Sequence, residues 1–115
     1  MRALRIFLLV EGLAFLAAAL THSGVLMRGY EHGQASIAET VIAAVLFLGL
    51  TLTAMRPAMT RTFALIAQVF ALFGTLVGIF TIVAGIGPRT VGDLAYHLII
   101  IAFLTWGIVA AARSS

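Results

Sequence analysis

The chain of 115 residues contains no cysteine and no lysine, and only 10% of its residues are charged. Without cysteine it cannot form disulfides, thiolate metal sites or iron–sulfur clusters, and it cannot carry out thiol catalysis. All seven basic residues are arginines, and they are scattered singly instead of forming the patch or stripe expected of a nucleic-acid-binding protein. The chain also lacks a phosphate-binding loop, a nucleophile–base pair and metalloprotease spacing, so no enzyme class is predicted.

Apolar residues take the place of the missing charges. They make up 63% of the sequence, and the mean hydropathy is +1.17. A soluble domain has about 45–50% apolar and about 25% charged residues, so the composition indicates a protein surrounded by lipid. In lipid the backbone must satisfy its own hydrogen bonds, which leaves helices or a closed barrel. Because the apolar runs are long and do not alternate with polar residues, they predict helices.

Four apolar runs predict four membrane spans, at about residues 4–27, 35–55, 62–86 and 92–112. Each is long enough to cross the hydrocarbon core, which takes about 20 residues. The connections between them are short and rich in glycine and proline, so successive helices should be antiparallel neighbours. The predicted fold is an all-α integral membrane protein in which residues 1–115 form a single four-helix up-down transmembrane bundle.

The arginines indicate the orientation of this bundle, because cytoplasmic loops carry an excess of positive residues. If the N-terminus is inside, five arginines lie on the cytoplasmic side and two lie outside. The inner arginines are Arg2, Arg5, Arg56, Arg61 and Arg113, and the outer ones are Arg28 and Arg89. We therefore predict an N-in/C-in protein, with the lipid bilayer as its main partner and the bacterial cytoplasmic membrane as its location.

A first group of polar residues falls within the outer half of the predicted spans. Ionisable residues inside a span cost at least about 2.5–3.5 kcal/mol each, so they normally face the bundle interior and often serve a function. With a rise of about 1.5 Å per residue, His22, Glu39 and His97 all lie roughly 8–11 Å outward from their helix midpoints. Asp93 stacks one turn above His97. We predict that these residues form an outer polar layer, with Asp93, Tyr96 and His32 at its rim.

A second polar layer is predicted in the inner half of the bundle. Glu11 and Gln68 lie roughly 6–9 Å inward from their helix midpoints. Thr75 follows Gln68 by seven residues, so it shares the same helix face. A carboxylic acid and an amide can satisfy each other if Glu11 is protonated, which makes a structural role the simplest interpretation of this layer.

The outer layer is compatible with several ligands. Two histidines and a carboxylate can hold a divalent metal, so His22, Glu39 and His97 are candidate metal ligands. His22 and His97 could instead be axial ligands of a haem, or the histidine and glutamate groups could bind a quinone-like head group. A purely structural alternative is that the residues only cross-link helices, at about 0.6–2 kcal/mol per bond. Our leading expectation is a small polytopic membrane protein that binds one of these ligands.

Two other functions remain open from the sequence. Gly74 and Gly78 form a GxxxG motif, which lets helices approach closely and could support a homo-oligomer or a larger complex. The protein could therefore be an accessory subunit of a respiratory or photosynthetic assembly. Alternatively, Glu11 could be the proton-binding group of a small carrier that works as a dimer.

Overall fold

The computed structural model describes residues 2–87 and 89–114, and these residues fold almost entirely into helices. The long helices are α1 (Arg2–His22), α2 (Gly33–Met55), α3 (Thr60–Val83) and α4 (Val91–Arg113), and a 3-10 turn, η1 (Pro57–Met59), joins α2 to α3. No strand occurs within the described ranges, so the predicted all-helical class is confirmed. All four long helices have the length and apolar character needed to cross a membrane, as expected of an integral membrane protein.

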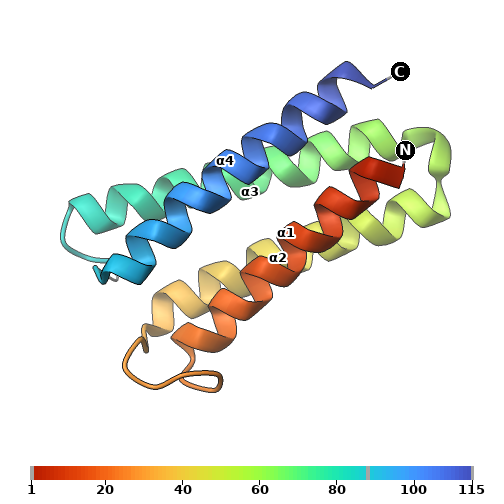
Figure 1. The fold of residues 1–115 in the computed structure, drawn as a ribbon. Helices are drawn as coiled ribbons and strands as arrows, with labels where there is room; N and C mark the ends of the chain where they lie inside the picture. Colours follow the sequence, from red (N-terminus) through yellow and green to blue (C-terminus); the bar gives the residue numbers. More distant parts are fainter. Residues whose placement is uncertain (1, 88, 115) are drawn as a thin grey trace.

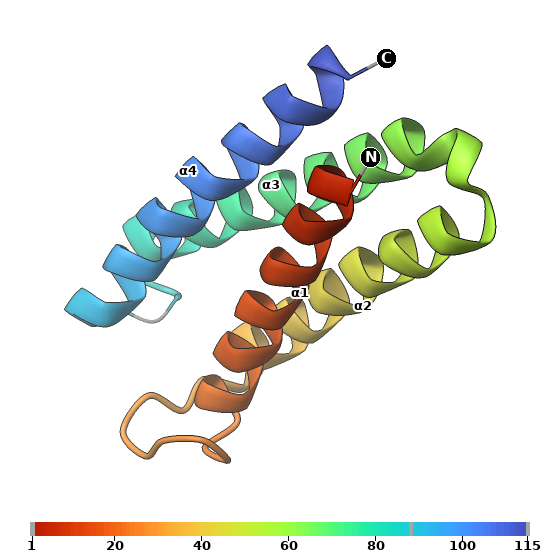
Figure 2. The same cartoon turned by 45° about the vertical axis from the view of Figure 1, so that its right-hand side comes forward.

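The helices are arranged as two antiparallel hairpins, α1–α2 and α3–α4, that pack against each other (Figure 1). Each helix contacts the next one along the chain, and α1 also contacts α3 and α4. Within the described residues, α2 and α4 make no such backbone approach, so they occupy opposite corners. Both chain termini lie at one end of the bundle, together with the α2–α3 connection (Figure 2). This connectivity agrees with the predicted up-down arrangement.

Helix α1 ends at His22, well before the predicted boundary near residue 27. Gly24 has a φ of +83°, a conformation that commonly ends a helix at glycine. The amides of the next two residues both donate to the Leu20 carbonyl, which closes the helix end. Residues 25–27 therefore form an exposed apolar turn instead of a further helical turn. His22 consequently is the last residue of α1, whereas the sequence predicts it one turn or more inside the helix.

At the opposite end of the bundle, arginine side chains satisfy the last carbonyl groups of neighbouring helices. The Arg5 guanidinium donates to the Thr53 carbonyl of α2 over 2.8 Å. Arg61 donates to the Ala111 and Ala112 carbonyls of α4 over 3.2 and 3.1 Å. A cation at a helix C-terminus also interacts favourably with the helix dipole. These contacts hold the ends of both hairpins that lie beside the chain termini in register.

The glycines of the GxxxG motif are used inside the bundle. A Cβ on Gly74 would lie 2.8 Å from Ile42 Cδ1 of α2, and a Cβ on Gly78 would lie 3.0 Å from His97 Nε2 of α4. Side chains of two neighbouring helices, Ile42 of α2 and His97 of α4, therefore pack closely against these glycines. Both glycines remain partly exposed, and association through Gly74 and Gly78 stays an untested prediction.

Candidate functional site

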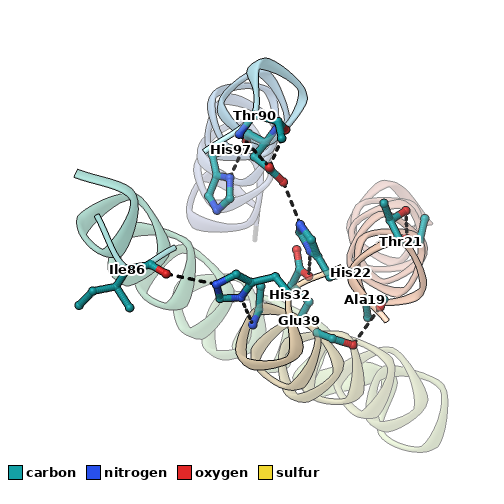
Figure 3. Close-up of polar contacts among 12 residues, drawn as sticks. Ala19, Thr21, His22, His32, Glu39, Ile86, Thr90 and His97 are labelled. Carbon is teal, nitrogen blue, oxygen red and sulfur yellow. Dashed lines mark hydrogen bonds and ion pairs between the residues drawn. The ribbon is translucent and has the colours of Figure 1, made fainter. Parts of the chain in front are cut away.

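His22, the last residue of α1, lies between two carboxylates from two other helices. Its Nδ1 is 2.5 Å from Glu39 Oε1 of α2, and its Nε2 is 2.8 Å from Asp93 Oδ1 of α4 (Figure 3). The exposed fractions of His22, Glu39 and Asp93 are 4%, 6% and 6%. We call these three residues the outer triad. The triad links helices α1, α2 and α4 through buried polar contacts.

The hydrogen bonds at the start of α4 indicate which atom carries the proton in the contact between Asp93 and His22. Asp93 Oδ2 accepts hydrogen bonds from the Thr90 amide at 3.1 Å and from the Thr90 hydroxyl at 2.5 Å. The Asp93 amide donates back to Thr90 Oγ1, which completes a capping box. Asp93 therefore acts as an acceptor at both oxygens, and the proton on its contact with His22 belongs to Nε2. Thr90 is a site residue that the sequence prediction omitted, although the spacing Thr90-x-x-Asp93 resembles this cap.

His97 does not join the outer triad. Its Nδ1 lies 2.6 Å from the Asp93 carbonyl oxygen, one turn earlier in α4. Because a carbonyl can only accept, Nδ1 carries a proton, and in a neutral imidazole the lone pair is then on Nε2. Figure 3 shows the His97 ring directed away from His22. The predicted convergence of His22, Glu39 and His97 is therefore corrected: the third member is Asp93.

This geometry does not support a metal or haem site built on His22. A histidine ligand needs a free lone pair on one nitrogen, and both His22 nitrogens face carboxylate oxygens. Within residues 2–87 and 89–114, no group of three or more His, Cys, Asp or Glu side chains is arranged to hold a metal ion. The shell of His22, Glu39 and His97 does not form, and the haem alternative loses one of its two axial ligands.

Beside the triad, a partly enclosed cavity of about 150 Å³ lies between α2, α3 and α4. It lies where, among the described residues, the backbones of α2 and α4 are not in contact. Gly74 and Gly78 form part of its wall on α3 and project no side chain into it. A cavity of about 150 Å³ can hold one benzene-sized ring. The side chains that bring polar groups to its wall are His32, Gln34, Glu39, Thr75, Thr81, Tyr96 and His97. The wall is otherwise mostly apolar, as is usual for a site that binds a small organic molecule.

Two neighbouring polar side chains of α4, Tyr96 and His97, line this cavity. The Tyr96 hydroxyl is buried and has no hydrogen-bond partner among the described residues. Leaving a buried polar group without a partner costs about 1–3 kcal/mol, so such a hydroxyl marks a place where a ligand could be accommodated. His97 Nε2 is free to accept a hydrogen bond, because Nδ1 already donates to the backbone. The cavity thus offers a donor and an acceptor from neighbouring residues.

His32 closes one side of the cavity mouth. The sequence suggests a residue near the outer interface, and the structure places it half-buried at the N-cap of α2. Its Nδ1 accepts from the Ala35 amide at 3.1 Å, and its Nε2 donates to the Ile86 carbonyl at 3.2 Å (Figure 3). The neutral ring therefore ties the start of α2 to the α3–α4 connection and positions the cavity rim.

A second, more open groove of about 500 Å³ lies between α1 and α4. Small side chains of α1, including Ala14, Ala17 and Ala18, form one wall. His22 and Asp93 line this groove, whereas Glu39 lines the cavity. The outer triad therefore extends from the cavity, at Glu39, to the groove, at His22 and Asp93.

The inner layer forms as a compact pair. Glu11 and Gln68 are fully buried, and a Cβ on Gly107 of α4 would overlap Gln68 Oε1 and lie 2.8 Å from Glu11 Oε2. Neither Glu11 oxygen has a partner among the described residues, nor does Gln68 Oε1, while Gln68 Nε2 donates to the Ala64 carbonyl. A proton on Glu11 would convert these facing acceptors into a donor and an acceptor. Gly107, which the sequence prediction omitted, provides the space for both side chains.

Thr75 is separate from this inner pair. Its hydroxyl donates to the Ala71 carbonyl over 2.7 Å, and its side chain lines the outer cavity. The shared helix face predicted for Gln68 and Thr75 exists, but seven residues are about two turns, or roughly 10 Å along the helix. Thr75 therefore belongs with the outer cavity, which corrects its predicted place in the inner layer.

Comparison with known proteins adds no functional information. No protein-family model, curated protein or solved structure matches the chain.

Proposed function

We propose that this protein binds a small aromatic ring bearing hydroxyl or carbonyl groups, such as the head group of a quinone-class lipid, in the outer cavity. The observation that carries this proposal is a ring-sized, mostly apolar cavity lined by two neighbouring polar side chains of α4, Tyr96 and His97. The Tyr96 hydroxyl has no hydrogen-bond partner among the described residues, and His97 bonds the backbone only through Nδ1. The proposed setting is the outer half of an N-in/C-in bundle in a bacterial cytoplasmic membrane.

The two polar groups complement the two redox forms of such a ring. A ring hydroxyl can donate to His97 Nε2, and a ring carbonyl or hydroxyl oxygen can accept from the Tyr96 hydroxyl. The flat faces of the ring would pack against apolar lining residues such as Phe15 and Ile42. A ligand with this balance fits the general character of small-molecule sites, which are mostly apolar with a few placed polar groups.

The rim of the cavity gives such a ligand a route from the lipid. Ala38 of α2 and Val77 of α3 both line the cavity and are exposed on the outside of the bundle. Gln34 and Ile86 are exposed rim residues near the helix ends. An apolar tail could therefore leave between α2 and α3 into the bilayer while the ring stays inside. The alternatives of an accessory subunit and of a proton-coupled carrier have no comparable support. Gly74 and Gly78 pack against side chains of the same chain, and Glu11 faces Gln68.

Binding of 4-nitrophenol to the protein in lipid nanodiscs tests this proposal. We expect saturable binding, read from the absorbance of the phenol, beyond its partition into empty nanodiscs. Tyr96→Phe removes only the hydroxyl and should weaken binding up to about tenfold, the equivalent of one hydrogen bond of about 0.5–1.5 kcal/mol. His97→Phe keeps an aromatic ring but removes the acceptor, so it should weaken binding by a similar factor.

Two controls isolate the polar contacts from general partition into lipid. Nitrobenzene, which lacks the hydroxyl, should bind more weakly than 4-nitrophenol in the wild-type protein. Tyr30→Phe makes the same chemical change as Tyr96→Phe at a residue that lines the groove instead of the cavity, and it should leave binding unchanged. Equal affinities for 4-nitrophenol in the wild type, Tyr96→Phe and His97→Phe would contradict the proposal.

A further inference from the structure

We infer that Glu39, His22 and Asp93 form a proton path that connects the ligand cavity with the groove between α1 and α4. This inference rests on the proposed function, because a ring hydroxyl in the cavity is the source or acceptor of the proton. It assigns the outer triad a role beyond holding three helices together.

The path from the cavity to the groove is continuous. Glu39 lines the cavity and contacts His22 at 2.5 Å, and His22 contacts Asp93 at 2.8 Å. Asp93 lines the groove, which is the more open of the two hollows. Both steps are hydrogen-bond distances between groups that can each gain and lose a proton. No intervening water is needed between the cavity wall and the groove wall.

His22 also has protons at both of its contacts with the carboxylates. Its Nε2 carries a proton that points at Asp93, whose second oxygen is held by Thr90. One further proton lies on the 2.5 Å contact between Nδ1 and Glu39 Oε1, where either atom can carry it. Histidine is suited to such transfer because it can accept a proton at one nitrogen and release one from the other.

The remaining polar groups near the triad either form hydrogen bonds of their own or lie at the end of the triad that faces the cavity. Thr90 hydrogen-bonds Asp93 and is exposed, while His32 is bonded to Ala35 and Ile86. Tyr96 lines both hollows and His97 lines the cavity, where a ligand can reach them. The triad is therefore the bonded connection between the two hollows.

The transfer conserves protons and involves no electrons. A proton released by the ring in the cavity binds the free oxygen of Glu39, and His22 then carries protons on both nitrogens. The Nε2 proton moves to Asp93 Oδ1, and Asp93 releases it to water in the groove. This transfer leaves the remaining His22 proton on Nδ1 and the Glu39 proton on its other oxygen. Exchange of the Nδ1 proton with water in the groove returns a proton to Nε2, and rotation of the Glu39 carboxyl then restores the starting protonation. The same steps in reverse deliver a proton from the groove to the cavity.

A proton-jump experiment on bound 4-nitrophenol tests the path. The protein in nanodiscs is loaded with the phenol at high pH, the pH is lowered rapidly, and protonation of the bound phenolate is followed by its absorbance. His22→Gln keeps a side chain that can donate and accept hydrogen bonds but cannot relay a proton. We expect protonation of the bound phenolate to slow at least about tenfold in this variant, with affinity within about twofold of the wild type, a difference of about 0.4 kcal/mol.

A second variant leaves the triad intact and closes its outer end. A Cβ on Gly92 would meet Thr90 and Tyr30 only at 3.7 Å, so Gly92→Leu can be accommodated and would narrow the groove. It should also slow protonation. Thr40→Ala, next to Glu39, removes an exposed hydroxyl that bonds only its own helix and lines neither hollow, so it serves as the matched control with an unchanged rate.

The outcomes separate this inference from the proposed function. Bound phenolate that is protonated at the wild-type rate in both His22→Gln and Gly92→Leu would overturn the proton path and leave ligand binding intact. If His22→Gln does not fold, slow protonation in Gly92→Leu supports the path and an unchanged rate refutes it. If the wild type does not bind 4-nitrophenol at all, the proposed function fails and the path falls with it.

Discussion

Replacing His22 with alanine is expected to lower the free energy of unfolding by about 3–5 kcal/mol, the cost of removing one partner from a buried ionic contact. The substitution leaves Glu39 and Asp93 buried without the group that both carboxylates contact. It also removes the only side chain that bonds α1 to both α2 and α4 among the described residues. Reversible unfolding in mixed detergent micelles, followed by far-UV circular dichroism, measures this loss.

The control for this experiment is the neighbouring residue. Thr21→Ala deletes an exposed hydroxyl and should change the free energy of unfolding by no more than about 0.5 kcal/mol. In the double variant His22→Ala/Glu39→Ala, one of the two stranded carboxylates is also removed, so the combined loss should be smaller than the sum of the single losses. A His22→Ala protein as stable as Thr21→Ala would show that the triad contributes little to the fold.

Gly107→Ala should produce the second large effect, in the inner half of the bundle. The added methyl group would overlap Gln68 Oε1 and lie 2.8 Å from Glu11 Oε2, so α4 must move or both side chains must rearrange. Overpacking of this kind typically costs about 1–3 kcal/mol, and displacing two buried polar groups adds to that cost. The same unfolding measurement applies.

A double-mutant cycle identifies the cause of the Gly107 effect. With Gln68 already truncated, as in Gln68→Ala, the methyl group of Gly107→Ala occupies space vacated by the amide and should cost much less. Gly33→Ala is the matched control, because a Cβ there meets no atom within 4 Å. An equal cost of Gly107→Ala in the wild-type and Gln68→Ala backgrounds would contradict this account of the inner layer.

The helical architecture could be predicted from the sequence because it depends on composition and run length alone. Continuous apolar runs separated by short glycine- and proline-containing connections lead to four antiparallel helices. The end of α1 could not be predicted in this way, since residues 25–27 are as apolar as the helix before them. The helix ends there because Gly24 adopts a left-handed conformation, a signal that hydropathy does not register.

The composition of the two polar layers was only partly predictable. Depth along each helix places His22, Glu39 and His97 at one level and Asp93 one turn beyond, whereas the structure joins His22 and Glu39 to Asp93. The direction of His97 depends on a bond from its ring to the carbonyl one turn earlier, and this choice is invisible in residue spacing. Residue spacing can therefore group residues by height, but packing decides which of them meet.

The roles of Gly78 and Gly107 could be recognised only in the structure. Gly78 looks like part of an association motif, yet it makes room for the His97 ring at the cavity. Gly107 lies in an unremarkable apolar run, yet it accommodates Glu11 and Gln68. A glycine is recognised as part of a site only when the side chain that fills its missing Cβ position is known.

The most direct test of the account is the ¹⁵N NMR signal of His97 Nε2 during titration with 4-nitrophenol. The account predicts a neutral ring with an unprotonated Nε2 in the free protein, and a shift of this signal when the phenol hydroxyl donates to it. The His32 signal serves as a comparison within the same cavity: both of its nitrogens are already hydrogen-bonded, so it should move less than the signal of His97 Nε2. A saturable change at His97 Nε2, absent with nitrobenzene, would support a ring-binding cavity, whereas an unchanged His97 signal at saturating phenol would contradict it.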